Sequence, residues 1–160
     1  MKFHPAVASV EVGPSGTGAK WMVVDDTEAV LQMTAEMLKM FTDAEICCFQ
    51  SPKEALRAFE DDPSAFGLVV TDFDMPEMNG AELCSKLRAI TPDLKIILAT
   101  GSVNMLEAKA FNLGFAAFLA KPFSAAAISS ALFRAEASSR RILNSAPSRS
   151  LKETARNLCA

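Results

Sequence analysis

Short apolar runs alternate with stretches of helical periodicity along most of this chain. Five runs have the length and composition of buried strands, and they lie at residues 21–24, 44–50, 67–71, 95–100 and 116–120. After each run, apolar residues recur every three or four positions, as in amphipathic helices that pack on a core. The pattern therefore predicts five strands that alternate with five helices.

The first two helices have clear signals. The first follows Thr27, and the residues predicted to share its buried face are Val30, Met33, Met37, Leu38 and Phe41. The second opens with Ser51 as N-cap, Pro52 at its first position and Glu54 three residues after the cap. Its predicted buried residues are Ala55, Leu56 and Phe59, and residues 61–63 should end it.

Later helices carry weaker signals. The third is marked by Leu83, Leu87 and Ile90 and should end at Thr91-Pro92. A fourth runs to Leu113, and Gly114 is well placed as its C-terminal cap. The last is predicted to begin after Ser124 and to bury Ile128, Leu132 and Ala135.

Strands that alternate with helices imply crossover connections, and hence a parallel sheet covered on both faces. Right-handed crossovers favour a doubly wound α/β domain. For five strands we expect a flavodoxin-like three-layer (βα)5 sandwich with the order 2-1-3-4-5 and a crevice where strands 1 and 3 diverge.

The two ends of the chain lack this pattern. Residues 1–19 end in the breaker-rich stretch 13–18 and are predicted to form a flexible extension. The domain should span residues 20–137. Residues 138–160 hold five basic residues against one glutamate and are predicted to form a partly disordered or helical tail, which is either solvated or docks on an acidic partner.

Composition narrows the class of protein. Apolar residues make up 50% of the chain, charged residues 22%, and the net charge of −3 argues against nucleic-acid binding. No membrane span or signal peptide is evident, so we expect a cytoplasmic protein. Four cysteines without CxxC spacing should be reduced thiols. His4 is the single histidine, which excludes a multi-histidine metal centre and argues against a phosphohistidine carrier.

Polar residues follow or end four of the predicted strands: Asp25, Asp26, Asp72, Thr100 and Lys121. Each alone is ordinary, since a strand-end Asp is usually a cap or a turn former. In the expected strand order, however, they converge on one edge of the sheet. Three crowded carboxylates repel one another unless a cation neutralises them, and Mg²⁺ suits a small site with oxygen ligands.

These residues resemble a known family. Asp25-Asp26, the run Thr71-Asp72-Phe73-Asp74-Met75-Pro76-Glu77-Met78-Asn79-Gly80, Ala99-Thr100-Gly101 and Phe118-Leu119-Ala120-Lys121-Pro122-Phe123 look like the receiver domain of two-component response regulators. The resemblance covers residues 21–137. Its D-x-x-M-P-x-M-x-G run is highly specific, whereas the Lys-Pro pair alone would be weak.

The resemblance implies a phosphorylation site. Asp72 would be the phosphoacceptor and would take a phosphoryl group from a phosphohistidine on a sensor histidine kinase or a histidine phosphotransfer protein. Asp26 and Asp72 would bind Mg²⁺ directly, Asp25 through water, and Asp74 through its backbone carbonyl. Lys121 and Mg²⁺ would neutralise the phosphoryl oxygens, and the Thr100 hydroxyl would donate to one of them.

The resemblance also implies a switch. Thr100 would move toward the phosphoryl group and vacate space for Phe118, which would repack the face formed by helix 4, strand 5 and helix 5. Plain core packing of Phe118 remains an equal alternative. Gly101 leaves room for the phosphoryl group, and Asp74 and Ser102 match positions that tune its lifetime.

Two other functions stay open at this point. Asp72-Phe73-Asp74 resembles the D-x-D nucleophile loop of haloacid-dehalogenase-type phosphatases, although that loop usually follows the first strand. A receiver-like module that binds a partner without being phosphorylated is the second, but such modules generally lose part of the acidic pocket. The favoured hypothesis is a phosphoacceptor rather than an enzyme. With 23 residues after Ala137, we expect a stand-alone receiver that acts on an unidentified downstream protein.

Overall fold

The fold is built on one five-stranded parallel sheet. The computed structural model describes residues 20–101 and 113–145. The strand order is β2-β1-β3-β4-β5, which confirms the predicted order 2-1-3-4-5. The strands are β1 (Lys20–Val24), β2 (Glu45–Phe49), β3 (Phe66–Asp72), β4 (Lys95–Thr100) and β5 (Ala117–Ala120).

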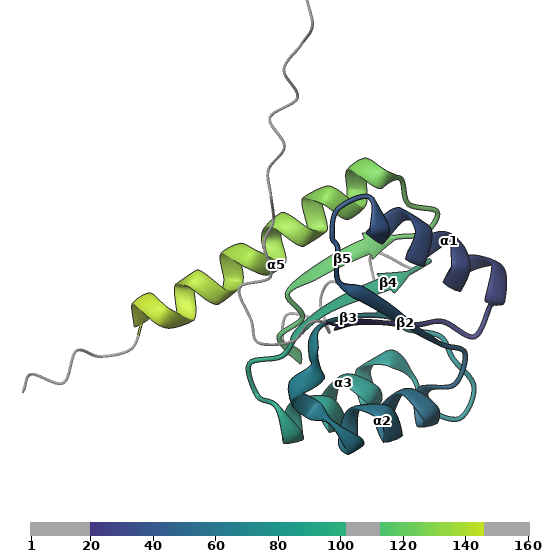
Figure 1. Cartoon of the computed structure of the whole chain (residues 1–160), viewed down its shortest axis with the longest axis horizontal. Coiled ribbons are helices and arrows are strands. Elements are labelled where there is room, and N and C mark those ends of the chain that lie inside the picture. Colours follow the sequence, from purple (N-terminus) through teal and green to yellow (C-terminus); the bar gives the residue numbers. More distant parts are fainter. Residues whose placement is uncertain (1–19, 102–112, 146–160) are drawn as a thin grey trace, which may run out of the picture.

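Four described helices cover the two faces of this sheet. They are α1 (Glu28–Lys39), α2 (Pro52–Asp61), α3 (Gly80–Ile90) and α5 (Ala125–Ser145), and a short 3₁₀ turn, η1 (Pro63–Ala65), follows α2. Helices α1 and α5 lie on one face and α2 and α3 on the other, and α5 projects beyond the sheet (Figure 1). The predicted three-layer sandwich is confirmed, while most of the predicted fourth helix lies outside the described residues.

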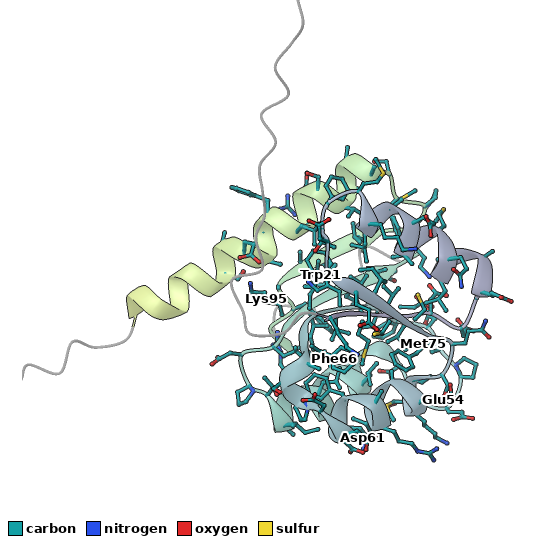
Figure 2. All side chains as sticks on the ribbon, viewed as in Figure 1. Trp21, Glu54, Asp61, Phe66, Met75 and Lys95 are labelled. Atoms are coloured by element: carbon teal, nitrogen blue, oxygen red, sulfur yellow. The ribbon has the colours of Figure 1, made fainter. Side chains whose placement is uncertain are left out.

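Each face of the sheet has its own hydrophobic core. Trp21, Val23 and Leu68 pack toward α1 and α5, together with Leu31 and Ile128 of those helices. On the other face, Met22, Val69 and Ile96 pack toward α2 and α3. Figure 2 shows Trp21 and Phe66 in these two layers. Central strands buried on both faces explain why their sequences are continuous apolar runs.

The helix signals were mostly correct. The Ser51 side chain accepts a hydrogen bond from the Glu54 backbone N–H, and Pro52 opens α2, which ends at Asp61. The Ser124 hydroxyl accepts from the Ala127 N–H at the start of α5. Gly114 adopts a left-handed conformation, with φ +67°, as a C-terminal cap requires.

The predicted buried face of α1 was wrong in part. Of that set, Leu38 is buried, but Met33 is 39% exposed, and the helix buries Leu31, Thr34 and Ala35 instead. Apolar residues surround more than half of this helix, so periodicity alone does not fix which stripe faces inward. Thr34 can be buried because its hydroxyl donates to the Val30 carbonyl, 2.7 Å away.

The ends of α3 and α5 bear on two further expectations. Ile90, which marked the third helix in the sequence, is 40% exposed because it is the last residue of α3. Helix α5 continues to Ser145, so residue 137 lies inside a helix. The predicted extension 1–19 and residues 146–160 of the predicted tail lie outside the described residues. None of the helices in the described part of the chain is both long enough and apolar enough to cross a membrane.

Candidate functional site

The strand register brings the predicted polar residues to one edge of the sheet. Val24 pairs with Thr71, Asp72 with Ala99, and Thr100 with Ala120. The residues at or just after these strand ends therefore lie together. We call this set the carboxyl edge, and it consists of Asp25, Asp26, Asp72, Thr100 and Lys121.

Lys121 lies between two of the carboxylates. Its Nζ is 2.6 Å from Asp25 Oδ2 and 3.1 Å from Asp72 Oδ1. The other Asp25 oxygen, Oδ1, accepts a hydrogen bond from the Thr27 backbone N–H at 2.9 Å. Both oxygens of Asp25 are thus engaged, which fixes this buried side chain between Lys121 and the start of α1.

Backbone hydrogen bonds hold Asp72 in place. The Phe73 N–H donates to the Ala99 carbonyl at 3.1 Å, and the Gly80 N–H donates to the Phe73 carbonyl at 2.9 Å. The first residue of α3 therefore lies directly against the end of β3. A Cβ on Gly80 would collide with the Asp72 carbonyl oxygen and would come within 3.0 Å of the Phe73 Cα, so this contact requires glycine.

Burial and charge shift the pKa values of both ion-pair partners. Burial raises the pKa of the Asp72 carboxyl, and the nearby Asp25 charge adds to this, although Lys121 acts in the opposite direction. For Lys121, burial alone would lower the pKa, but the hydrogen bonds to Asp25 and Asp72 outweigh it and the pKa is raised. Lys121 is therefore a cation at neutral pH, and its charge only partly offsets that of the carboxylates.

The three carboxylates fit a hard divalent cation. One oxygen each from Asp25, Asp26 and Asp72 lies within 4.8 Å of the others. Oxygen ligands of this kind suit Mg²⁺, which keeps several waters and takes one or two carboxylates directly. Asp26 is exposed, so water and substrate can approach from that side.

The remaining predicted residues lie around this cluster. Thr100 is buried at the end of β4, and Asp74 is exposed in the turn after β3. Gly101 is exposed, and a Cβ there would meet none of the described atoms within 4 Å. Phe118 is half-buried on β5, and its ring packs edge-on against Phe115. Ser102 lies outside the described residues.

Sequence reasoning missed several contacts that shape the site. Asn79 and Glu82 form a reciprocal capping box at the start of α3, which an N-x-x-E pattern could have indicated. Thr27 donates to Asp25 in a short-range turn of the kind that Asp favours. Glu77 has a positive φ of 70° and pairs with Lys53 at 2.8 Å, which no sequence signal indicated.

Comparison with known proteins identifies the family. Residues 21–133 match the family model described as the response regulator receiver domain. The chain is 35% identical over 131 residues to the C4-dicarboxylate transport transcriptional regulatory protein DctD of Rhizobium meliloti, covering 81% of this chain and 26% of DctD. It is 34% identical over 111 residues to the transcriptional regulatory protein FixJ of Azorhizobium caulinodans, covering 69% of this chain and 51% of FixJ.

Solved structures of response regulators share this fold. A response regulator receiver domain protein from Clostridium thermocellum superposes with a TM-score of 0.68 at 27% identity, covering 77% of this chain and 98% of that one. The chemotaxis response regulator CheY4 of Vibrio cholerae gives 0.65 at 26% identity, covering 74% and 99%.

The chain spans about a quarter of DctD and about half of FixJ. Neither the phosphatase alternative nor the unphosphorylated module is favoured by these matches. The match to the family model extends from the second residue of β1 into α5, and the carboxyl edge lies within it. This chain belongs to the response regulator receiver domain family, the phosphoacceptor domains of two-component signal transduction.

Proposed function

We propose that Asp72 of this receiver domain accepts a phosphoryl group from a phosphohistidine in a Mg²⁺-dependent reaction. The observation that carries the proposal is the position of the Asp72 carboxylate, 3.1 Å from Lys121 Nζ and within 4.8 Å of two further carboxylates. A nucleophile beside a cation and a metal-binding cluster is the arrangement that phosphoryl transfer needs, since the reaction depends on positioning and charge neutralisation.

Each residue of the carboxyl edge has a role in this proposal. An Asp72 oxygen attacks phosphorus and forms a P–O bond as the P–N bond of the phosphohistidine breaks. The electron pair of the P–N bond goes to the imidazole nitrogen, which takes a proton from solvent. When bound, Mg²⁺ supplies neutralisation of the phosphoryl oxygens. Asp26 and Asp72 would be its direct carboxylate ligands, joined by the backbone carbonyl of Asp74, and Asp25 would act through water.

The same site would drive the switch. The hydroxyl of Thr100, at the end of β4, donates a hydrogen bond to the attached phosphoryl group. The resulting movement of Thr100 changes the packing of the neighbouring strand β5. Phe118 pairs in register with Leu98, two residues before Thr100. This position beside Thr100 supports the proposal that the Phe118 ring enters the space that Thr100 vacates. Gly101 keeps the approach open, and Asp74 and Ser102 tune the lifetime of the acyl phosphate.

The phosphodonor is a sensor histidine kinase or a histidine phosphotransfer protein, and α1 offers a surface for it. Val30, Met33, Met37 and Met40 recur at helical spacing, with Met33 39% and Met40 69% exposed. Because α1 begins at Glu28, two residues after Asp26, the Val30 and Met33 end of this strip lies nearest the carboxyl edge, and Met37 and Met40 lie toward the far end of the helix. Flexible methionines suit an apolar helical partner.

The test is phosphorylation by acetyl phosphate with Mg²⁺, read as intact mass. We expect one phosphoryl adduct on the parent, none on Asp72→Asn, and the parent level on the matched control Asp61→Asn, an exposed aspartate at the end of α2. Addition of EDTA should suppress the adduct. No adduct on the parent, or an equal adduct on Asp72→Asn, would contradict the proposal.

A further inference from the structure

One arginine joins three parts of the fold at the edge of the sheet opposite the carboxyl edge. Arg88 lies on α3, and its Nη1 donates to the Leu113 carbonyl at 2.9 Å while its Nη2 donates to the Leu94 carbonyl at 3.2 Å. Leu94 directly precedes β4, and Leu113 lies four residues before β5. Within the described part of the chain, Arg88 Nε is buried without a hydrogen-bond partner. Two hydrogen bonds from one planar guanidinium fix both carbonyls relative to α3.

Gly114 makes this contact possible. Its φ of +67° lets the chain turn sharply after Leu113, and a Cβ there would lie 2.5 Å from Arg88 Nη1. A side chain at this position would therefore push the guanidinium away from the Leu113 carbonyl. Arg88 and Gly114 form one unit, which we call the Arg88 clamp.

The Arg88 clamp holds the backbone next to Phe115, whose ring packs against that of Phe118. Phe115 follows Gly114, and the next residue, Ala116, donates its N–H to the Ile96 carbonyl at 2.8 Å. The backbone on both sides of Phe115 is thus tied down, and its ring packs partly buried against the α2–α3 core. The Phe115 and Phe118 ring centroids are 5.8 Å apart at 68°, an edge-to-face arrangement that aromatic pairs favour.

We propose that Arg88 is a positioning residue for the switch: it holds Phe115 against Phe118 and so opposes movement of Phe118 in the unphosphorylated protein. This inference rests on the proposed function, which makes Phe118 the ring that moves. Loss of the clamp frees Phe115 and lowers the free-energy difference between the resting and switched packings. The switched population then rises before any phosphoryl group is attached.

The absence of tyrosine from this chain provides a reporter. Phe118→Tyr creates a single tyrosine, which 3-fluorotyrosine labels with one fluorine signal. The signal is recorded without phosphodonor and then with acetyl phosphate and Mg²⁺, which defines the resting and switched positions. In this background we compare Arg88→Ala, Arg88→Lys and the matched control Lys86→Ala, an exposed residue of the same helix.

We expect Arg88→Ala to move the resting signal at least a quarter of the way toward the switched position. Arg88→Lys should move the signal less, because an ammonium group retains the positive charge but cannot bond both carbonyls as the planar guanidinium does. Lys86→Ala should leave the signal in place. Arg88→Lys also serves if Arg88→Ala does not fold. A resting signal that stays in place in both Arg88 variants, with only a lower Tm, would overturn the proposal. A background variant that does not respond to acetyl phosphate, although intact mass shows the phosphoryl adduct, would contradict the proposed switch and this inference with it. A background variant that responds while both Arg88 variants leave the resting signal in place would overturn this inference alone.

Discussion

At the carboxyl edge of the sheet one lysine faces three carboxylates, whereas at the opposite, amino edge Arg88 and Lys95 each have oxygen partners of their own. Arg88 bonds two backbone carbonyls, and Lys95 pairs with Glu136 of α5 at 2.7 Å, with only 13% and 24% of the two side chains exposed (Figure 2 labels Lys95). The positive charges of these two residues are thus matched by oxygen atoms, and their contacts join α3 and α5 to the segments at the start of the strands. The carboxyl edge keeps excess negative charge, which costs stability and suits a metal ion. A bound metal ion would in turn neutralise an incoming phosphoryl group.

The largest effect is expected where α3 meets β3. Gly80→Ala should lower the free energy of unfolding by about 1–3 kcal/mol, because the new methyl group collides with the Asp72 carbonyl. Phosphoryl incorporation should fall as Asp72 is displaced. Gly101→Ala is the control for stability alone, since its Cβ meets no described atom within 4 Å. Urea unfolding and intact mass measure both effects, and equal stability of the two variants would contradict this account of Gly80.

The contribution of the Lys95–Glu136 ion pair at the amino edge is tested by removing one of its charges. Glu136→Gln should cost about 1–2 kcal/mol, between the values for exposed and fully buried pairs, because Lys95 loses its partner. Phosphorylation should stay within about twofold of the parent, as the pair is remote from the carboxyl edge. Glu36→Gln, which breaks the exposed pair with Lys39, is the control and should change stability by less than about 0.5 kcal/mol. A similar loss of unfolding free energy in Glu136→Gln and Glu36→Gln would contradict the claim that the partly buried pair contributes more stability than the exposed pair.

Burial of Asp72, to which the charge of Asp25 adds, predicts a pH dependence of stability in metal-free protein. The pKa of Asp72 is raised, so the folded state binds this proton more tightly than the unfolded chain. Its contribution to stability is therefore greatest below the ordinary Asp pKa of about 3.9 and is lost as pH rises through the folded pKa. At neutral pH, Asp72→Asn should raise Tm by a few degrees. Thermal unfolding in EDTA, with Asp61→Asn as control, measures this, and a lower Tm for Asp72→Asn would contradict it.

The smallest expected effect concerns backbone strain beside the site. Glu77 holds a φ of 70° in the turn that carries Asp74, a conformation that Asn adopts more readily. Glu77→Asn should stabilise the fold by about 0.5 kcal/mol net. Lys53→Met measures the loss of the exposed Lys53–Glu77 ion pair by itself. If Glu77→Asn is less stable than Lys53→Met, the turn is not strained.

Much of the fold could be predicted from the sequence because local signals and packing agree. The five apolar runs became the five strands, with β4 at the predicted bounds, and turn residues marked the ends of α2. The inward stripe of α1 could not be predicted, since Leu31 and Met33 are equally apolar and only the neighbouring α5 and sheet decide between them.

The candidate site was predictable only in outline. Strand-end Asp25, Asp72 and Lys121 had to converge once the strand order was known, and they do. The bonds of Arg88 to Leu113 and Leu94 depend on long-range geometry, and an Arg within a helical pattern gives no sequence signal of them. For the same reason, the strained φ of Glu77 could not be foreseen from its side chain.

The central claim is that the acyl phosphate forms on Asp72. The most direct test treats the protein with acetyl phosphate and Mg²⁺, reduces it with borohydride, which converts an aspartyl phosphate to homoserine, and locates the product by peptide mass analysis. The account predicts homoserine at position 72, with Asp25, Asp26 and Asp74 unchanged. Homoserine at another aspartate, or none in a preparation that carries the phosphoryl adduct, would contradict it.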